Sequence, residues 1–504
     1  MSKPTRFPCW LRRLPCAIAV AAILATHGAS AQHEATQNRQ RLSREQVLRM
    51  TVQHNPTLHA AMLEVQQASE NLRLEQGRNP YTLQVDGGLT RSSMPQAVGQ
   101  RYDVSTNYSA ELGAQLSRTF WNGTRGSVRV DHSTRLQTQP TDAGPTYNTA
   151  ARATISHPFM RGSGTKIGEQ RLRIARIQRS TADLTRARTA SEIARDVLVA
   201  YWDLWYAEAA VNIEESARDL ALRQRNEAKE RAAEGALASV ELLPFETRVA
   251  GLEESVISAH TDRRSKSLAL SQHIGSEQAL GTALFAQIAS KPTVSPLPSR
   301  AMAIERALTQ SPEIKELEGQ LRLAQEQLNT SGDAYRPRLD LEGYVQIAGM
   351  GNEEISPMAR QLGTFKATSV HIGLVYELPL DSSQKSAERA AQTAAFNVVK
   401  QRLIAARQRI QTQVDTLIEQ ENAARVRLEL AEKTAEIAQK QVEAETERFQ
   451  LGVAISVEVQ QAEDEWRKAR LRTERARVDV AQMEVRRAHA TGQLLEQIRD
   501  WLST

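Results

Sequence analysis

Histidine and cysteine, the side chains that most often bind metals or act as nucleophiles, are spread along this sequence without a spacing that joins them in one site. The ten histidines include no pair at a useful ligand spacing. His54 and His59 are five residues apart, which places them on different faces of a helix. Both cysteines, Cys9 and Cys16, lie within the first 31 residues. We therefore expect no metal site, no disulfide and no cofactor in the rest of the chain.

A short glycine-rich run, Gly162-Ser-Gly164-Thr-Lys166, superficially resembles a phosphate-binding loop. A true loop of that kind places Gly-Lys-Ser or Gly-Lys-Thr in that order, which this run does not. We interpret it as a flexible junction between a strand and a helix. Serine, histidine and aspartate are also scattered without a nucleophile elbow. The residue types therefore predict no catalytic residues and no enzymatic activity.

Two glutamates, Glu241 and Glu458, occupy equivalent places in the two halves of the chain. The same offset of 217 relates two further pairs, Gly235 with Gly452 and Ser239 with Ser456. If the serines are N-caps, each glutamate lies in the first turn of a helix, where a carboxylate suits the helix dipole. The glycines suggest helix ends with a positive φ angle.

The offset of 217 persists for forty residues, to Gly275 and Gly492, which indicates an internal duplication. The starts of the halves also match, because Asn55-Pro56 and Ser311-Pro312 each read as an N-cap followed by proline. The predicted organisation is listed in chain order: signal peptide 1–31, first repeat 32–275, Pro-punctuated linker 276–298, second repeat 299–492 and tail 493–504.

Each repeat reads as helix, strands, long helix, turn and return helix. The strands are expected at about 81–158 and 338–378, the long helices at about 165–234 and 382–451, and the return helices at about 240–274 and 457–490. Apolar residues alternate in the strands, as at Leu83, Val85 and Leu89. Stretches of about 9–11 such residues fit tilted strands in a bilayer, and they fit a soluble half-buried sheet equally well.

The first repeat is longer between its strand-bounding prolines than the second, with room for an extra hairpin of residues 104–120 and 125–137. The chain could therefore hold four or six strands. An extra hairpin would either enlarge the sheet or form a separate extracellular cap.

The long helices contain no proline and show heptad spacing, for example at Leu428, Ala435, Val442 and Phe449. A second, weaker seam passes through Leu430, Ile437 and Ala444. A helix with two seams can pack against a neighbour on each side, as a ring of helices requires.

The N-terminus reads as a secretory signal, with Lys3, Arg6, Arg12 and Arg13 before an apolar run and Ala29-Ser30-Ala31 before the cleavage point. Removing it leaves 60 basic against 59 acidic residues, so the charge gives no case for nucleic-acid binding. The mature sequence has no run of 18 apolar residues, and entry into a membrane would therefore require β-strands in a closed barrel.

Several motifs, taken in their order along the two repeats, resemble those of the TolC-like outer-membrane efflux protein family. The segments that carry the resemblance are Leu42 to Leu48 with Asn55-Pro56, Tyr201-Trp-Asp-Leu204, His157-Pro-Phe-Met-Arg-Gly162, Leu378-Pro-Leu-Asp381, and Arg448-Phe-Gln-Leu-Gly452 running on to Thr491-Gly492. Together they span nearly all of the mature chain.

The resemblance implies a mainly α fold with a transmembrane β-barrel. A homotrimer would close one outer-membrane barrel of a Gram-negative bacterium in contact with lipid, continued by a trimeric α-helical barrel in the periplasm. Pro158 and Pro379 would mark the barrel-to-helix junctions. The chain would serve as the exit duct of a tripartite efflux or type I secretion system, with a periplasmic adaptor and an inner-membrane transporter as partners.

The resemblance also implies that the helical tips form a periplasmic gate. The residues involved would be Gly235, Ser239, Glu241, Phe449, Gly452, Ser456 and Glu458. Whether the two glutamates act on ions or only complement helix dipoles stays open. A coiled-coil adaptor or scaffold without a pore is the alternative function. The cargo, whether drug, metal or protein, stays open as well.

Overall fold

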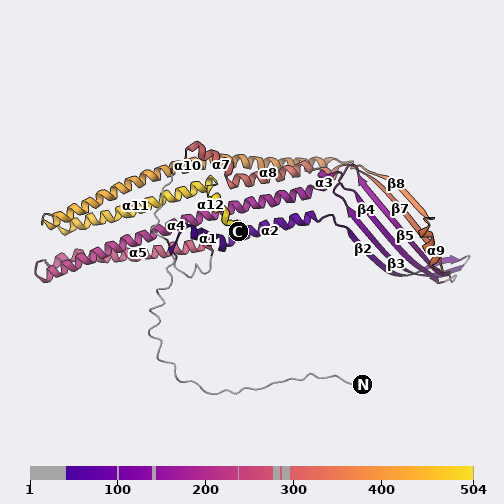
Figure 1. Ribbon diagram of the computed structural model, residues 1–504, viewed down its shortest axis with the longest axis horizontal. Helices are drawn as coiled ribbons and strands as arrows, with labels where there is room; N and C mark the ends of the chain where they lie inside the picture. Colours follow the sequence, from indigo (N-terminus) through magenta and orange to yellow (C-terminus); the bar gives the residue numbers. More distant parts are fainter. Residues whose placement is uncertain are drawn as a thin grey trace, which may run out of the picture.

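The computed structural model describes residues 41–98, 101–138, 143–236, 238–275, 284–286 and 296–502. These residues form an elongated molecule with long helices at one end and a β-sheet at the other (Figure 1). The predicted signal peptide lies outside the described residues, as does most of the predicted linker. The predicted tail forms a helix, α12 (Gln493–Leu502), within the described range.

Six helices make up most of the helical end. Their bounds are α2 Pro56–Gln76, α4 Gln170–Ala233, α5 Leu243–Ile274, α8 Pro312–Thr330, α10 Ser383–Gln450 and α11 Ser456–Ala490. Near the sheet the neighbours run in the order α2, α4, α8, α10, and towards the far end in the order α5, α4, α11, α10. At 1.5 Å per residue, α4 and α10 extend about 95 Å and 100 Å. Four helices therefore lie side by side at both levels.

Local sequence signals explain where several of these helices begin. The Asn55 side chain accepts a hydrogen bond from the Leu58 amide at 3.0 Å, and Pro56 occupies the first helical position of α2. Ser311 precedes Pro312 in the same way, but its side chain makes no capping hydrogen bond. In the first repeat a four-residue helix, α3 (Thr165–Gly168), precedes α4 with a break at Glu169.

The first heptad seam packs inside the α10–α11 hairpin. Leu428 is buried and Ala435, Val442 and Phe449 are half-buried, facing the α11 side of the layer. The second seam is uncovered in the single chain, because Leu430 is 59% exposed and Ile437 is 57% exposed. The first seam is thus used within the chain, and the second seam faces away from it.

One open, antiparallel sheet of six strands forms the other end of the molecule, in the order β2-β3-β4-β5-β7-β8. The bounds are β2 Thr82–Val98, β3 Arg101–Thr119, β4 Arg125–Thr138, β5 Ala143–Pro158, β7 Arg338–Asn352 and β8 Thr368–Glu377. The extra hairpin of the first repeat is β3 and β4, and it lies in the middle of the sheet. Among the described residues this sheet therefore has six strands, and the hairpin is not a separate cap.

The register gives the sheet two unlike faces. Directly opposed pairs on one face are apolar, such as Leu116 with Val128 and Leu341 with Leu374. The other face is polar, and there Arg129 forms ion pairs with Asp86 at 2.9 Å and Asp131 at 2.7 Å. A short helix, α9 (Ser356–Gly363), packs on the apolar face at the end far from the long helices.

The largest apolar core lies midway along the helical end. Tyr201 and Trp205 of α4 are almost fully buried there, packed with Leu42, Val47 and Ile274. Smaller elements complete this region: β1 Arg41–Leu42, α1 Arg44–His54, β6 Phe285–Ala286 and α7 Arg300–Gln310. None of the helices in the described part of the chain is long and apolar enough to cross a membrane.

Candidate functional site

The turns that end the two helical hairpins share one backbone design. Gly235 has a φ of 78° and Gly452 a φ of 74°, in the left-handed region that glycine adopts without strain. The amide after each glycine donates back across the turn, from Ala236 to the Arg231 carbonyl at 2.8 Å and from Val453 to the Arg448 carbonyl at 2.9 Å. This is the Schellman arrangement of a helix end, and it confirms the expected positive-φ glycines.

The serines after these turns are not N-caps, which corrects the prediction. Ala238 precedes the 3₁₀ turn η2 (Ser239–Leu242), and Ile455 precedes α11, so each serine is already the first helical residue. The first helical bonds run from Glu241 to the Ala238 carbonyl at 2.9 Å and from Glu458 to the Ile455 carbonyl at 3.1 Å. Each helical segment therefore begins one residue earlier than predicted, with Ala238 and Ile455 as the N-cap residues.

The two glutamates have different surroundings despite their equivalent positions. The Glu458 carboxylate accepts a hydrogen bond from the Ile455 amide at 3.3 Å, which satisfies a free donor at the start of α11. Glu241 is exposed at the start of α5. A capping role thus has direct support for Glu458.

The tips are apolar and uncovered in the single chain. Val240, Leu451, Val453 and Ile455 are all more than 60% exposed. Beside them a groove of about 570 Å³ separates the two hairpins, lined among others by Leu243, Pro244, Val457, Gln460 and Gln461. A surface of this kind, apolar and flanked by polar residues, is typical of a protein interaction site. Phe449, also predicted at the tip, is half-buried on α10.

A buried polar cluster joins the two hairpins behind the tips. Arg248 of α5 contacts Glu463 of α11 at 2.7 Å, and both side chains are less than a tenth exposed. Gln224 of α4 donates to the same Glu463 at 2.8 Å. One turn further along α11, Arg467 contacts Glu214 of α4 at 2.7 Å. The sequence analysis missed this cluster, although Arg248 and Glu463 adjoin the buried apolar residues Val249 and Ala462.

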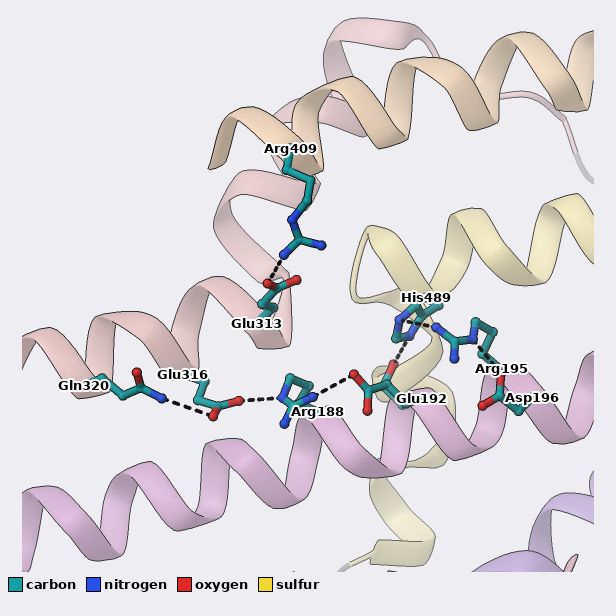
Figure 2. A network of polar contacts seen from close by, with 10 residues as sticks. Arg188, Glu192, Arg195, Asp196, Glu313, Glu316, Gln320, Arg409 and His489 are labelled. Atoms are coloured by element: carbon teal, nitrogen blue, oxygen red, sulfur yellow. Dashed lines mark hydrogen bonds and ion pairs between the residues drawn. The ribbon is translucent and has the colours of Figure 1, made fainter. Parts of the chain in front are cut away.

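A second polar network joins the repeats closer to the sheet (Figure 2). Arg188 of α4 bridges Glu316 of α8 at 2.6 Å and Glu192 of its own helix at 2.8 Å. A few residues along α4, Arg195 donates to Nε2 of His489 from α11 at 3.3 Å, and Ser191 contacts Nδ1 at 2.8 Å. Because an arginine can only donate, His489 is neutral with its proton on Nδ1.

The two junction prolines lie where the strands end, but their surroundings differ. Pro158 is the last residue of β5 and is buried, whereas Pro379 follows β8 and is exposed. The difference comes from the β3–β4 turn, whose Gly123 packs against the Pro158 ring. The Gly162–Gly164 run forms the junction itself, and both glycines have positive φ angles.

The sequence pattern of the outer membrane efflux protein family matches residues 303–493. No curated protein matches this sequence. Solved structures with a similar fold include the outer membrane protein VceC of Vibrio cholerae, which is 14% identical with a TM-score of 0.62 over 89% of this chain and 96% of that one.

Two further structures extend the comparison. The CmeC outer membrane channel of Campylobacter jejuni is 13% identical, with a TM-score of 0.65 over 91% of this chain and 89% of that one. The open state of the MtrE outer membrane channel of Neisseria gonorrhoeae is 16% identical, with a TM-score of 0.59 over 89% of this chain and 88% of that one.

Outer membrane efflux proteins are transport ducts, and the prediction that this chain is not an enzyme is thereby confirmed. The predicted resemblance is confirmed as well. Over residues 303–493 the chain carries the sequence pattern of outer membrane efflux proteins, and over about nine-tenths of its length it has the fold of TolC-like outer-membrane channels.

Proposed function

We propose that three copies of this chain form an outer-membrane exit duct, which passively conducts substrate from an inner-membrane transporter and a periplasmic adaptor to the exterior. The observation that supports this most is that the chain is a layer with unused edges on both sides. The sheet ends in unpaired strands β2 and β8, and the helical layer ends in α10 on one side and in α2 and α5 on the other.

Apolar side chains on the two helical edges favour closure with further copies of the chain. On α10 the uncovered seam of Leu430 and Ile437 faces away from the rest of the protomer. On the opposite edge Ile257 of α5 and Leu63 of α2 are both more than 60% exposed. Pairing α10 of one protomer with α2 and α5 of the next would bury both sets. Such an interface joins two different surfaces, head to tail, and interfaces of this kind can close identical subunits into a ring.

The sheet has the side-chain pattern of a barrel wall in lipid. Its apolar face carries Leu83, Val85 and Leu89 on β2, all more than 60% exposed. Near the helical end this face carries the aromatic side chain of Tyr81, and the Arg118 guanidinium lies over that ring, 4.6 Å from its centre. Transmembrane barrels have such an apolar outer band flanked by aromatic residues, with a polar interior. The polar face with Arg129 and Asp86 would line the duct.

The tips would meet the adaptor, because they hold exposed apolar residues beside the groove between the hairpins. The predicted signal peptide fits export to this location. Nothing in the residues along the layer selects a cargo, so the substrate class is set by the transporter in this proposal. A mature charge near neutrality gives no reason to expect a nucleic acid as cargo or partner.

Outer-membrane residence as a trimer is the first expected result. The chain should fractionate with the outer membrane and migrate as an oligomer in unheated gels, then as a monomer after boiling, because barrel hydrogen bonds resist detergent. Recovery as a soluble periplasmic monomer would contradict the duct and favour the coiled-coil scaffold without a pore.

Neutralising the tip carboxylates tests whether they act on ions. Three-fold symmetry would gather Glu241 and Glu458 of every protomer near one level, and a concentrated negative charge favours cations. In the variant Glu241→Gln/Glu458→Gln, single-channel recordings should show lower cation selectivity and weaker block by divalent ions. Glu458→Gln also replaces the charged acceptor of the Ile455 amide with a neutral one, so Glu241→Gln alone is the cleaner test of the charge. Unchanged selectivity in the double variant would contradict a role for these two carboxylates in the passage of ions.

A further inference from the structure

The β3–β4 hairpin is a full part of the sheet wall. β3 pairs with β2 from Thr82 opposite Ser117 to Val98 opposite Arg101. β4 pairs with β5 from Arg125 opposite Ser156 towards the other end of the sheet. Both faces continue across the hairpin, since Ala114 and Val130 extend the apolar face and Gln115 and Arg129 extend the polar face. Nothing in the pairing separates these two strands from their neighbours.

The turn between β3 and β4 is fixed to the junction between the sheet and the helices. The Asn122 carbonyl accepts a hydrogen bond from the Gly164 amide at 3.2 Å, and the Thr124 hydroxyl contacts Nδ1 of His157 at 2.7 Å. Gly168 of α3 lies so close to the Trp121 carbonyl that any side chain at position 168 would overlap it. This contact also coincides with the break between α3 and α4. The turn therefore belongs at the helical end of the sheet.

The inserted hairpin changes the ratio of strands to helices. Each chain supplies six strands but only four helices, α2, α4, α8 and α10, at the level next to the sheet. Three chains would supply eighteen strands and twelve helices. Twelve helix axes spaced about 8–10 Å apart give a ring with a circumference of about 95–120 Å.

The strands can be compared with that ring by the same arithmetic. Strands about 4.8 Å apart and tilted by about 35–45° each occupy about 6–7 Å of a barrel's circumference. Eighteen such strands give about 105–120 Å, which matches the helical ring. Twelve would give only about 70–80 Å at the same tilt. A barrel with the extra hairpins thus meets the helical tube without a step in width.

We propose that the β3 and β4 strands of each protomer cross the outer membrane, so that the assembled duct has an eighteen-stranded barrel as wide as its twelve-helix tube. The inference rests on the proposed trimeric duct. The barrel would have a diameter of about 35 Å measured at the backbone, against about 24 Å for twelve strands at the same tilt. The membrane segment is then not a constriction, and the narrow point of the pathway lies at the helical tips.

The side of the membrane on which Asn122 lies tests this proposal. Asn122 is an exposed residue of the β3–β4 turn, whereas Lys366 is an exposed residue between α9 and β8 at the opposite end of the sheet. The mature chain lacks cysteine, so Asn122→Cys and Lys366→Cys each introduce a single thiol. Whole cells are treated with a large polyethylene-glycol maleimide that does not cross the outer membrane, and wild type serves as the unlabelled control.

We expect the maleimide to label Lys366→Cys on intact cells. It should label Asn122→Cys only after the outer membrane is permeabilised. Both strands of the hairpin must then cross the membrane, and native mass spectrometry showing a trimer in the same samples gives eighteen strands. If Asn122→Cys is labelled on intact cells as fast as Lys366→Cys in an outer-membrane trimer, the eighteen-stranded barrel is wrong while the duct stands. Absence of both variants from the outer membrane would instead overturn the proposed function.

Discussion

Replacing Glu421 with glutamine is expected to lower the midpoint temperature of thermal unfolding by about 3–5 °C. Breaking a buried ion pair by removing one partner costs about 3–5 kcal/mol, because the remaining charge is left without compensation. For a chain of this length, 1 kcal/mol corresponds to a shift on the order of 1 °C. The effect is therefore large for a substitution that leaves the side-chain volume nearly unchanged.

The geometry around Glu421 explains the size of this effect. The side chain is fully buried between α10 and α11. Its Oε2 atom accepts from Nε of Arg487 on α11 at 2.7 Å, and Oε1 accepts from Arg425 on α10 at 2.6 Å. One carboxylate thus compensates two arginines, of which Arg487 is only 6% exposed. Neutralising it leaves two like charges facing each other in a poorly solvated site.

A matched substitution on the same helix separates burial from charge. Glu436, also on α10, forms an ion pair at 2.8 Å with Lys440, which is one helical turn further along the same helix. Both side chains are about two-thirds exposed. Exposed pairs of this kind contribute little, so Glu436→Gln should leave the midpoint temperature unchanged. Circular dichroism of the detergent-purified oligomer measures both variants. Equal midpoints for Glu421→Gln and wild type would mean that the Glu421 carboxylate does not stabilise the fold.

Periodic patterns in the sequence predicted much of this fold. Alternation at Leu83, Val85 and Leu89 indicated a strand, and β2 includes all three. The heptads indicated two apolar seams on α10, because a helix face is set by local spacing alone. The proline-glycine signals near Pro56 and Gly452 likewise depend only on the backbone conformation that each residue prefers.

Contacts between distant segments were not predictable in the same way. Glu421 and Arg487 are 66 residues apart, and Arg248 and Glu463 lie on different repeats. In the sequence each reads as one more charged residue on a solvated helix, and only the packing of α4, α5, α10 and α11 brings them together. The close approach of the β3–β4 turn to Gly168, next to the break before α4, is likewise a contact between distant segments.

The helix starts at the tips show a related limit. Ser239 and Ser456 were predicted as N-caps from residue type, but both became the first residues of helical turns. Serine suits either position, and the tight turn after each glycine decides between them. The functional role of the tip glutamates depends on neighbouring protomers, so it stays a prediction.

A loss of stability in mild acid is the second large effect expected, and it depends on His489. The pKa of His489 is lowered from 6.5 to about 4, first by burial and next by the nearby Arg195 guanidinium, while Glu192, Asp196 and a hydrogen bond with Ser191 oppose the shift. The unfolded chain therefore takes up a proton at this residue near pH 6.5, whereas the folded chain does so only near pH 4. The stabilisation is complete above pH 6.5 and is lost as the pH falls from 6.5 to 4.

A pKa difference of this size corresponds to about 3 kcal/mol, or a fall of about 3 °C in the midpoint temperature between pH 6.5 and pH 4. Carboxylates also titrate towards the acid end of this range, so the contribution of His489 is the difference between wild type and His489→Gln measured at each pH. Glutamine cannot take up the proton, and its pH profile should be flatter. His273→Gln, which changes an exposed histidine at the end of α5, should keep the wild-type slope. Parallel profiles for wild type and His489→Gln would mean that protonation of His489 does not distinguish the folded chain from the unfolded chain.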